Sequence, residues 1–390
     1  PDNDFGNWTT ASKSGTKFHD LDADGVKEAG EPGLENWTIY VDYDDDGVLD
    51  AGEPSASTAA DGTYTIQGID PGTWKVREVG QADWFCSFPT DDDGKGCYHS
   101  DTFGSGDAIL ENDFGNWTWA SKSGTKFEDL NANGAWDSGE PGLPGWTIYV
   151  DQDGDGYDAT EPQAITAADG TYTINGIQPG VGYRIYEVQQ AGWTCSFPAD
   201  TDANGCYYDE LFVSGQPEID NDFGNYEPAE IDGYKYEDVN RNGSYDDTVD
   251  GFLENWAIQL WQGGGVIAST TTDASGYFAF TGLMPGLTYE VREVCPTTVP
   301  GETWTQTEPT PTNGCGSGVH GGIVPVSGET VTRWFGNYQT FTMTGFATKF
   351  HDLNADGVWD SPGEPGLAGI TIYIDYHGNQ SFDAATEPTV

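Results

Sequence analysis

The sequence has few basic side chains: 14 Lys and Arg stand against 65 Asp and Glu, giving a formal net charge of −51 over 390 residues. A surface this acidic repels polyanions, which excludes general electrostatic binding to nucleic acid or to an anionic membrane. No apolar run approaches the roughly 18 residues that a membrane-spanning helix needs. We therefore expect no nucleic-acid partner and no membrane span in this sequence.

The acidity is not accompanied by a shortage of aromatic residues, which make up 13% of the chain. Acidic chains poor in aromatics stay disordered, whereas Trp, Tyr and Phe bury large areas and build a packed core. We therefore expect a folded protein whose carboxylates have another role. They form a salt-adapted surface, or they supply ligands for cations.

Cysteine is scarce, and no Cys-x-x-Cys spacing or His partner accompanies it, which disfavours zinc. We interpret the cysteines as local disulfides, which indicate an oxidising compartment outside the cytoplasm. The alternative is a set of buried free thiols. The chain starts at Pro1 without a signal peptide, so we expect an export signal that was removed or lies outside this sequence. The predicted pairs are Cys86 with Cys97, Cys195 with Cys206, and Cys295 with Cys315.

A short motif recurs along the chain at a nearly constant interval. Lys17-Phe18-His19-Asp20 returns with its Lys at 126, 235 and 349, in steps of 109, 109 and 114 residues. Each unit closes with Phe-Gly-Asn, at 114–116, 223–225 and 335–337. Such self-similarity is typical of a tandem array. We predict a closing strand of a preceding repeat at 1–10, complete repeats at 11–118, 119–227 and 228–339, and the first half of a further repeat at 340–390.

Within a repeat, short alternating segments are separated by turn residues. In the first complete repeat the segments are 37–41, 64–66 and 74–79, with turns at 60–62 and 71–72. No apolar pattern of helical period runs long enough to predict a helix. Short strands between Gly and Pro turns predict an all-β tandem array of Ig-like β-sandwich domains. Short linkers between the repeats predict a fairly stiff rod.

Asp-rich loops follow the predicted strands. Counting Asp20 as position 1, side-chain oxygens fall at positions 1, 3, 5, 9 and 12, with Gly at position 6. This is the spacing of the EF-hand loop, in which position 7 adds a backbone carbonyl and a Glu closes the shell around Ca²⁺. Three loops match in full. Their predicted ligands are Asp20, Asp22, Asp24, Val26, Glu28 and Glu31; Asp42, Asp44, Asp46, Val48, Asp50 and Glu53; and Asp129, Asn131, Asn133, Ala135, Asp137 and Glu140.

Other loops depart from this spacing. Glu161 comes one position early, Glu364 comes one position late, and the third repeat's loop ends on Asp250. Their predicted ligands are Asp151, Asp153, Asp155 and Glu161; Asp238, Asn240 and Asn242; and Asp352, Asn354, Asp356, Asp360 and Glu364. A loop at Asp375 carries His377 and Gln380 at unusual positions, and in the third repeat the second loop is replaced by residues 261–264. The alternative is a set of Asp/Asn/Gly turns that bind nothing.

Several longer motifs resemble the SdrD B-like domain family across essentially the whole chain. They are Lys-Phe-His-Asp-Leu-Asp-Ala-Asp-Gly, Gly-Glu-Pro-Gly-Leu-Glu-Asn-Trp, Ala-Asp-Gly-Thr-Tyr-Thr-Ile and Pro-Gly-Thr-Trp-Lys-Val-Arg-Glu-Val. The resemblance implies a prealbumin-like β-sandwich and EF-hand-like calcium loops that are free of helices. It also implies use in bacterial or archaeal surface adhesins and giant extracellular proteins. The cysteine pairs are not a general feature of that family.

Each complete repeat also has a Lys on its first strand, a Glu in mid-domain and an Asn on its last strand. This set looks like the related Cna B-type domains, in which Lys and Asn join by an isopeptide bond. Burial would lower the Lys pKa and raise the Glu pKa, giving a neutral amine beside a proton donor. The alternative is a Lys–Glu ion pair beside a capping Asn. The sets are Lys17, Glu78 and Asn116; Lys126, Glu187 and Asn225; and Lys235, Glu293 and Asn337.

Asn7 and Asn116 each begin an Asn-Trp-Thr sequence, which would permit glycosylation, but Asn225 and Asn337 lack the hydroxyl residue. The five His residues do not recur together, and no Gly-x-Ser-x-Gly occurs, so we expect no enzyme. We predict a structural repeat module of an extracellular fibre, filament or surface adhesin stalk, with neighbouring repeats or copies of itself as partners. The alternative is a module that binds a host, surface or glycan ligand through exposed Trp8, Trp117 and Trp119.

Overall fold

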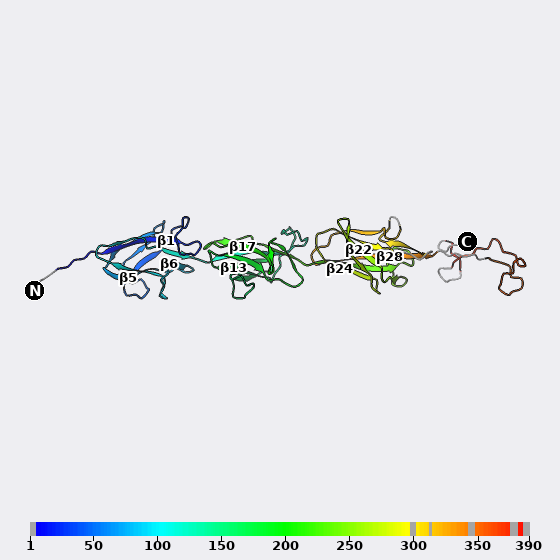
Figure 1. Ribbon diagram of the computed structural model, residues 1–390, viewed down its shortest axis with the longest axis horizontal. Helices are drawn as coiled ribbons and strands as arrows, with labels where there is room; N and C mark the ends of the chain where they lie inside the picture. The colour runs from blue at the N-terminus through cyan, green and yellow to red at the C-terminus, as the bar shows by residue number, and fades with distance from the viewer. Residues whose placement is uncertain (1–4, 297–301, 312–313, 342–347, 375–380, 385–390) are drawn as a thin grey trace.

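The computed structural model describes residues 5–296, 302–311, 314–341, 348–374 and 381–384. Within these residues every helix or strand assigned is a β-strand, which confirms the all-β expectation, and no helix is long and apolar enough to cross a membrane. The strands form six sheets, two in each of three successive stretches of chain. The three stretches follow one another in a row along the long axis of the molecule (Figure 1).

In the first stretch, one sheet has the order β4-β1-β9-β6 with β8 beside β1, and the other has the order β3-β2-β5-β7. The two sheets enclose a core of buried Ile, Val, Tyr and Phe side chains. Its strands are β1 (Ala11–His19), β2 (Thr38–Asp42), β3 (Ser55–Ser57), β4 (Thr63–Ile69), β5 (Gly72–Glu78), β6 (Phe85–Phe88), β7 (Tyr98–Phe103), β8 (Ala108–Ile109) and β9 (Phe114–Trp117).

The second stretch repeats this arrangement, with sheets β13-β10-β19-β15, to which β18 adds, and β12-β11-β14-β17-β16. Its strands are β10 (Ala120–Glu128), β11 (Thr147–Asp151), β12 (Gln163–Ile165), β13 (Thr171–Ile177), β14 (Gly182–Glu187), β15 (Thr194–Phe197), β16 (Thr201–Asp202), β17 (Gly205–Leu211), β18 (Pro217–Glu218) and β19 (Phe223–Tyr226).

The third stretch has sheets β21-β20-β28-β26, with β24 beside β20, and β23-β22-β25-β27. Its strands are β20 (Ala229–Glu237), β21 (Gly251–Phe252), β22 (Ala257–Gln262), β23 (Gly265–Thr271), β24 (Tyr277–Leu283), β25 (Tyr289–Val294), β26 (Glu302–Glu308), β27 (Val319–Ile323) and β28 (Thr330–Phe341). In the described residues beyond it, Phe350 forms a bridge with Gly366, like the bridges from Phe18 to Gly33 and from Phe127 to Gly142.

The first and last strands of each stretch pair in parallel. Lys17 lies opposite Phe114 in the β1–β9 ladder, Lys126 opposite Phe223, and Lys235 opposite Phe335. The paired Phe side chains are fully buried, and each such side chain adds about 1.5–3 kcal/mol to folding. This pairing closes each sandwich by joining residues about one hundred positions apart.

The connections between sandwiches are short. Only residues 118–119 separate β9 from β10, and only residues 227–228 separate β19 from β20. Trp8 and Trp119 are exposed, but the expectation of an exposed Trp117 is wrong. Trp117 is half-buried because it stacks on Phe85 with ring centroids 4.8 Å apart.

Residues 261–264 form a tight hairpin between β22 and β23. Trp261 pairs with Val266 and Gln262 with Gly265, so Gly263 and Gly264 make the turn. Their φ angles are 57° and 84°, a left-handed conformation that Gly adopts without a Cβ clash. The hairpin leaves no room for the second Asp-rich loop that the first two repeats have at this place.

A glycine inside the first strand of each sandwich is predicted to be irreplaceable. A Cβ on Gly124 would lie 1.8 Å from the carbonyl oxygen of Asn221, a backbone atom that cannot move aside cheaply. Gly124→Ala should destabilise the second sandwich by about 3 kcal/mol, at the upper end of overpacking costs. Calorimetry measures this effect. Gly182→Ala is the control, because its Cβ would meet nothing closer than 3.7 Å; equal losses in the two variants would contradict the steric explanation.

Candidate functional site

The Asp-rich loops share one backbone conformation. Position 4 lies in the left-handed region in all six described loops, with φ between 53° and 79°, and position 6 is a Gly with positive φ in each. The position-4 residues are Ala23, Asp45, Ala132, Gly154, Arg241 and Ala355. Left-handed non-Gly residues cost free energy unless the surroundings hold them, so the five non-Gly residues at this position indicate a constrained loop rather than a loose turn.

The first Asp of the loop holds this turn. In the first loop the Gly25 N–H donates to Asp20 Oδ2 at 2.8 Å, and the position-6 Gly of four other loops makes the same bond. In the Asp151 loop the first Asp accepts the N–H of Gly154, at position 4, instead. Asp20, Asp129 and Asp238 are fully buried at the end of their strands. The sequence-predicted ligands therefore start from a fixed, buried carboxylate.

The last carboxylate closes the loop in the same way in all six cases. Glu31 accepts the Leu21 N–H at 2.6 Å with one oxygen and the Glu28 N–H at 3.0 Å with the other. Glu53 and Glu140 accept the equivalent pairs. The loops with irregular spacing do the same through Glu161, Asp250 and Glu364.

The sequence reasoning missed Asp158 and Asp246 in these irregular loops, and it placed Asp250 at the loop's end without counting it as a ligand. Asp158, Asp246 and Asp250 occupy the places that Glu28 and Glu31 hold in the first loop. The signal that could have found them is an acid three or four residues before the closing carboxylate, since this separation is kept when the count from position 1 changes. The Asp375 loop, with His377 and Gln380, lies outside the described residues.

The donor set fits a hard divalent cation. Oxygens of Asp20, Asp22 and Asp24 lie within 4.8 Å of one another, as do those of Asp22, Glu28 and Glu31. Asp20 Oδ1 is buried and has no hydrogen-bond partner in the described chain. Burial, followed by the charge of Asp24, raises the pKa of Asp22. Ca²⁺ prefers oxygen ligands, and a bound ion would supply the missing partner of the buried Asp20 oxygen.

The second loop of the first repeat differs electrostatically. Oxygens of Asp42, Asp44 and Glu53 converge there too, but the Arg77 guanidinium already donates to Asp42 Oδ2 at 2.7 Å. The same guanidinium contacts Asp45 and Asp93. The hydrogen bonds from Arg77 and then Lys75 hold the pKa of Asp93 well below its usual range. A fixed positive charge therefore stands next to one predicted cation ligand in this loop.

All three predicted Lys, Glu and Asn sets come together in the described residues. Lys126 Nζ lies 2.8 Å from Asn225 Oδ1 and 3.4 Å from Glu187 Oε2, and Asn225 Nδ2 donates to Glu187 Oε1 at 2.6 Å. Lys235, Glu293 and Asn337 repeat these contacts at 2.7, 3.4 and 2.9 Å. In the first repeat, Lys17 contacts Asn116 and also Glu78 at 3.0 Å, and Asn116 donates to Glu78 at 2.6 Å.

Burial dominates the electrostatics of these sets. It lowers the pKa of Lys17, Lys126 and Lys235 to about 8 in each case, against a smaller opposing effect of the neighbouring Glu. Burial likewise raises the pKa of Glu78, Glu187 and Glu293. Each Lys ammonium also lies over a Trp ring, 4.3–4.5 Å from its centroid. The neutral amine is therefore accessible near neutral pH, and each carboxyl is easier to protonate than a solvated Glu.

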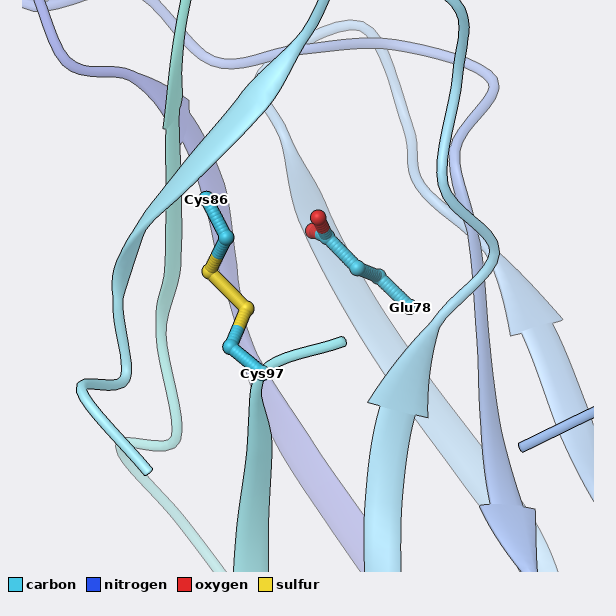
Figure 2. A group of neighbouring side chains, drawn as sticks. All are labelled: Glu78, Cys86 and Cys97. Atoms are coloured by element: carbon cyan, nitrogen blue, oxygen red, sulfur yellow. A yellow bond between two sulfur atoms is a disulfide. The ribbon is translucent and has the colours of Figure 1, made fainter. Parts of the chain in front are cut away.

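A disulfide lies beside each set. The structure contains the three predicted disulfides, Cys86–Cys97, Cys195–Cys206 and Cys295–Cys315, and no free cysteine among the described residues. Figure 2 shows the Glu78 carboxylate directed toward the first of them. Because both cysteines there are oxidised, this cluster of Glu78 and two sulfurs offers no thiolate to a metal.

A second group of buried lysines escaped the sequence reasoning. Lys122 Nζ pairs with Glu210 at 3.1 Å, and Asn221 Nδ2 donates to the same carboxylate at 2.7 Å. Lys13, Asp101 and Asn112 repeat this in the first sandwich. In the contacts of the described residues these lysines bond the acid and not the Asn. The signal that could have found them is strand alternation, which places Lys122 on the same face of its strand as the apolar Ala120.

Asn116 is buried and bonded to both Lys17 and Glu78, so it is not an accessible glycosylation site in the folded sandwich. Asn7 is exposed. The His side chains at 99 and 320 bond the backbone carbonyls of Asp113 and Trp334, which gives them a structural role in the core.

The fold and these loops define a class: tandem β-sandwich repeats with Asp-rich, EF-hand-like loops. Residues 229–322, within the third sandwich, match the SdrD B-like domain family, and the first two sandwiches have a similar strand order. The chain is 27% identical over 375 residues to serine-aspartate repeat-containing protein D of Staphylococcus aureus (strain Newman), covering 92% of this chain and 27% of that protein.

Serine-aspartate repeat-containing protein F of Staphylococcus epidermidis is 28% identical over 267 residues, covering 65% of this chain and 14% of the relative. The chain thus spans about a quarter or less of these relatives' length. Among solved structures, BcpA, the major pilin subunit of Bacillus cereus, aligns with 85% of this chain and 99% of its own at 11% identity and a TM-score of 0.37.

Removing the buried guanidinium of Arg77 should expose the repulsion within the second loop. Its side chain is 1% exposed, so Arg77→Met leaves Asp42 without its cation and should cost the first sandwich about 3–5 kcal/mol in metal-free buffer. Urea unfolding in chelator measures the loss. Arg184→Met is the control, since that side chain is 45% exposed and solvent screens its ion pairs, so it should cost much less. Similar losses in both would refute the argument.

Proposed function

We propose that this chain is a structural module of an extracellular fibre or surface adhesin stalk, in which calcium-loaded SdrD B-like repeats form a stiff rod. The repeats are residues 11–118, 119–227 and 228–339, flanked by parts of further repeats at 1–10 and 340–390. The row of sandwiches in Figure 1 and the two-residue linkers support this role. The similarity to the staphylococcal serine-aspartate repeat proteins supports it as well.

The observation that carries the calcium assignment is the invariant closing carboxylate. Six loops with three different spacings bring that group to the same backbone N–H donors. A turn that binds nothing would have no reason to keep this geometry while its length changes. Bound Ca²⁺ neutralises carboxylates that otherwise repel one another, so the metal is structural here. The three disulfides indicate the oxidising, extracellular setting.

Calcium should raise the thermal stability of the whole chain. Weak extracellular-type sites bind at about 0.1–1 mM, and calcium at ten times the Kd adds about 1.4 kcal/mol per site. Calorimetry in calcium and in chelator, at equal ionic strength, measures the shift. An unchanged transition would contradict the proposal.

A variant pair locates the effect. Changing Asp22 and Asp24 together to Ala should remove the part of the gain that belongs to the first loop, because both side chains supply oxygens to its cluster and Ala supplies none. Changing the exposed Asp83 to Asn should leave the gain intact. A calcium gain that is the same in both variants would rule out the first loop.

We also propose that each Lys–Glu–Asn set forms an isopeptide bond. The neutral Lys Nζ attacks Asn Cγ, the Nζ–Cγ bond forms, and the Cγ–Nδ2 bond breaks. The Glu protonates the departing Nδ2 and takes a proton from the amine, so that ammonia leaves and the carboxyl is regenerated. No oxidant or co-reactant is needed. The contact of Lys Nζ with the Asn amide supports the proposal in all three repeats.

Intact mass spectrometry tests the bond. The chain should weigh less than its sequence by three ammonia molecules, besides the hydrogens lost to disulfides. Glu187→Ala should restore the mass of one ammonia, because Asn225 loses its proton donor. Lys122→Arg is the matched control, since Lys122 bonds an acid but not the neighbouring Asn. A mass without ammonia loss would show that the sets are ordinary ion pairs.

Ligand binding through junction aromatics is the second candidate. Phe85, Trp117 and Trp119 form one surface cluster with ring centroids 4.8–5.1 Å apart. Stacked aromatic surfaces suit sugar rings or apolar protein side chains. Trp119→Ala should abolish glycan-array binding if this role is real and leave calorimetry in calcium unaltered.

A further inference from the structure

The first Asp-rich loop of a repeat contacts the next repeat. At the first junction, the Ser214 N–H donates to the carbonyl oxygen of Leu21, the second residue of the loop, at 2.8 Å. Ser214 Oγ accepts the Thr118 N–H of the linker at 2.8 Å and bonds His19 Nε2 at the same distance. One serine thus joins the loop, the strand before it and the linker. It is 1% exposed.

The second junction repeats this contact. The Ser327 N–H donates to the Leu130 carbonyl at 3.0 Å, and Ser327 Oγ accepts the Glu227 N–H at 2.9 Å. Ser327 is 9% exposed. Leu130 holds the same place in its loop as Leu21, so two junctions with different sequences use the same backbone groups.

A Pro-Gly turn of the following repeat receives the loop from the other side. A Cβ on Gly180 would lie 1.6 Å from the carbonyl oxygen of Asp22, and one on Gly286 would lie 2.1 Å from that of Asn131. The turn must therefore be Gly for the backbones to approach. In both cases the receiving surface offers N–H groups and Cα atoms, and the loop offers carbonyl oxygens. An acidic loop can dock this way without a basic partner.

Apolar side chains add to the first junction. A cleft there is lined by Leu21 and Ala29 on the loop side and by residues 211–213 of the next repeat. Phe212, within that stretch, is fully buried, and its carbonyl accepts the Gly180 N–H at 2.9 Å. The segment that ends at Ser214 and the Pro-Gly turn at Gly180 therefore form one connected surface.

The ends of the described array provide an internal contrast. In the third repeat the residue at the place of Leu21 is Val239, which is 53% exposed, whereas Leu21 and Leu130 are half-buried. In the first repeat the serine at the place of Ser214 is Ser105, which is exposed. The turn at Gly72 is one residue shorter there, and the Trp74 ring covers it. The loop residue and the serine are thus more buried where a loop and the next repeat contact each other than where they do not.

We propose that the first Asp-rich loop and the facing Ser and Pro-Gly surface form a docking interface that locks adjacent repeats into one rigid unit. The loop's partner is the following repeat of the same chain, held by the carbonyls of loop positions 2 and 3. The inference rests on the proposed role as a rod but not on calcium binding. The second and third repeats each accept the loop of the repeat before them. The first repeat has the serine, but its Pro-Gly turn is shorter.

Matched glycine variants test the interface. Gly180→Ala should disrupt the first junction, and Gly176→Ala is its control, because both glycines have similar φ angles of 82° and 78° but only Gly180 faces another atom within 4 Å. Gly286→Ala and Gly282→Ala form the same pair at the second junction, with φ of 73° and 71°. Any backbone strain is therefore equal within a pair.

The readout is amide hydrogen exchange of the full chain at fixed calcium. Gly180→Ala should speed exchange at Ser214 about tenfold or more, leave Ser327 unchanged and keep core amides of β13 protected, which shows that the repeat still folds. Gly286→Ala should affect Ser327 alone. Unchanged exchange at Ser214 in Gly180→Ala would overturn the proposal, as would an equal effect of Gly176→Ala.

A repetition of the same measurement in chelator separates this interface from the proposed calcium role. If the docking is real but calcium does not bind, amide exchange still differs between the two variants of each glycine pair. If the docking is absent, the pairs do not differ, whatever calcium does to the melting temperature.

Discussion

Everything in a repeat depends on the parallel pairing of its first and last strands. The ladder between β1 and β9 joins residues about one hundred positions apart and brings Lys17 beside Asn116. It continues one residue further, where the Asp20 N–H donates to the Asn116 carbonyl at 2.9 Å, and the same bond recurs at Asp129 and Asp238. One pairing therefore fixes the candidate cross-link and the start of the candidate metal loop.

The same pairing explains why the loop meets the next repeat. Because the first strand runs parallel to the last, the loop that follows β1 lies at the end of the sandwich from which the chain leaves. With only residues 118–119 in between, the next repeat begins beside that loop. The candidate metal loop, the chain exit and the receiving serine are thus gathered at one end. The backbone order of the loop and its contact with the next repeat have a common origin.

Charge is distributed unevenly in this molecule. Most carboxylates stay at the surface in loops, whereas five of the nine Lys side chains are buried: Lys13, Lys17, Lys122, Lys126 and Lys235. Each buried Lys faces an acid, which offsets the cost of removing its charge from water. Arg77 is likewise buried, and it pairs with Asp42 at the start of the second Asp-rich loop. More than half of the Lys side chains thus lie in the interior, whereas most of the Asp-rich loops have no Lys or Arg paired with them among the described contacts.

The sequence by itself determined the all-β class, the repeat spacing, the disulfide pairs and most of the loop residues, because these depend on local periodicity and on groups close together in the chain. Counting from position 1 missed Asp158 and Asp246, because that count fails when a loop gains or loses a residue. The sequence also did not indicate which acids Lys13 and Lys122 face, or that Arg77 lies beside Asp42. Only the tertiary structure decided these, and with them the docking of Leu21 on Ser214, because such contacts join distant segments whose approach is set by strand pairing and packing.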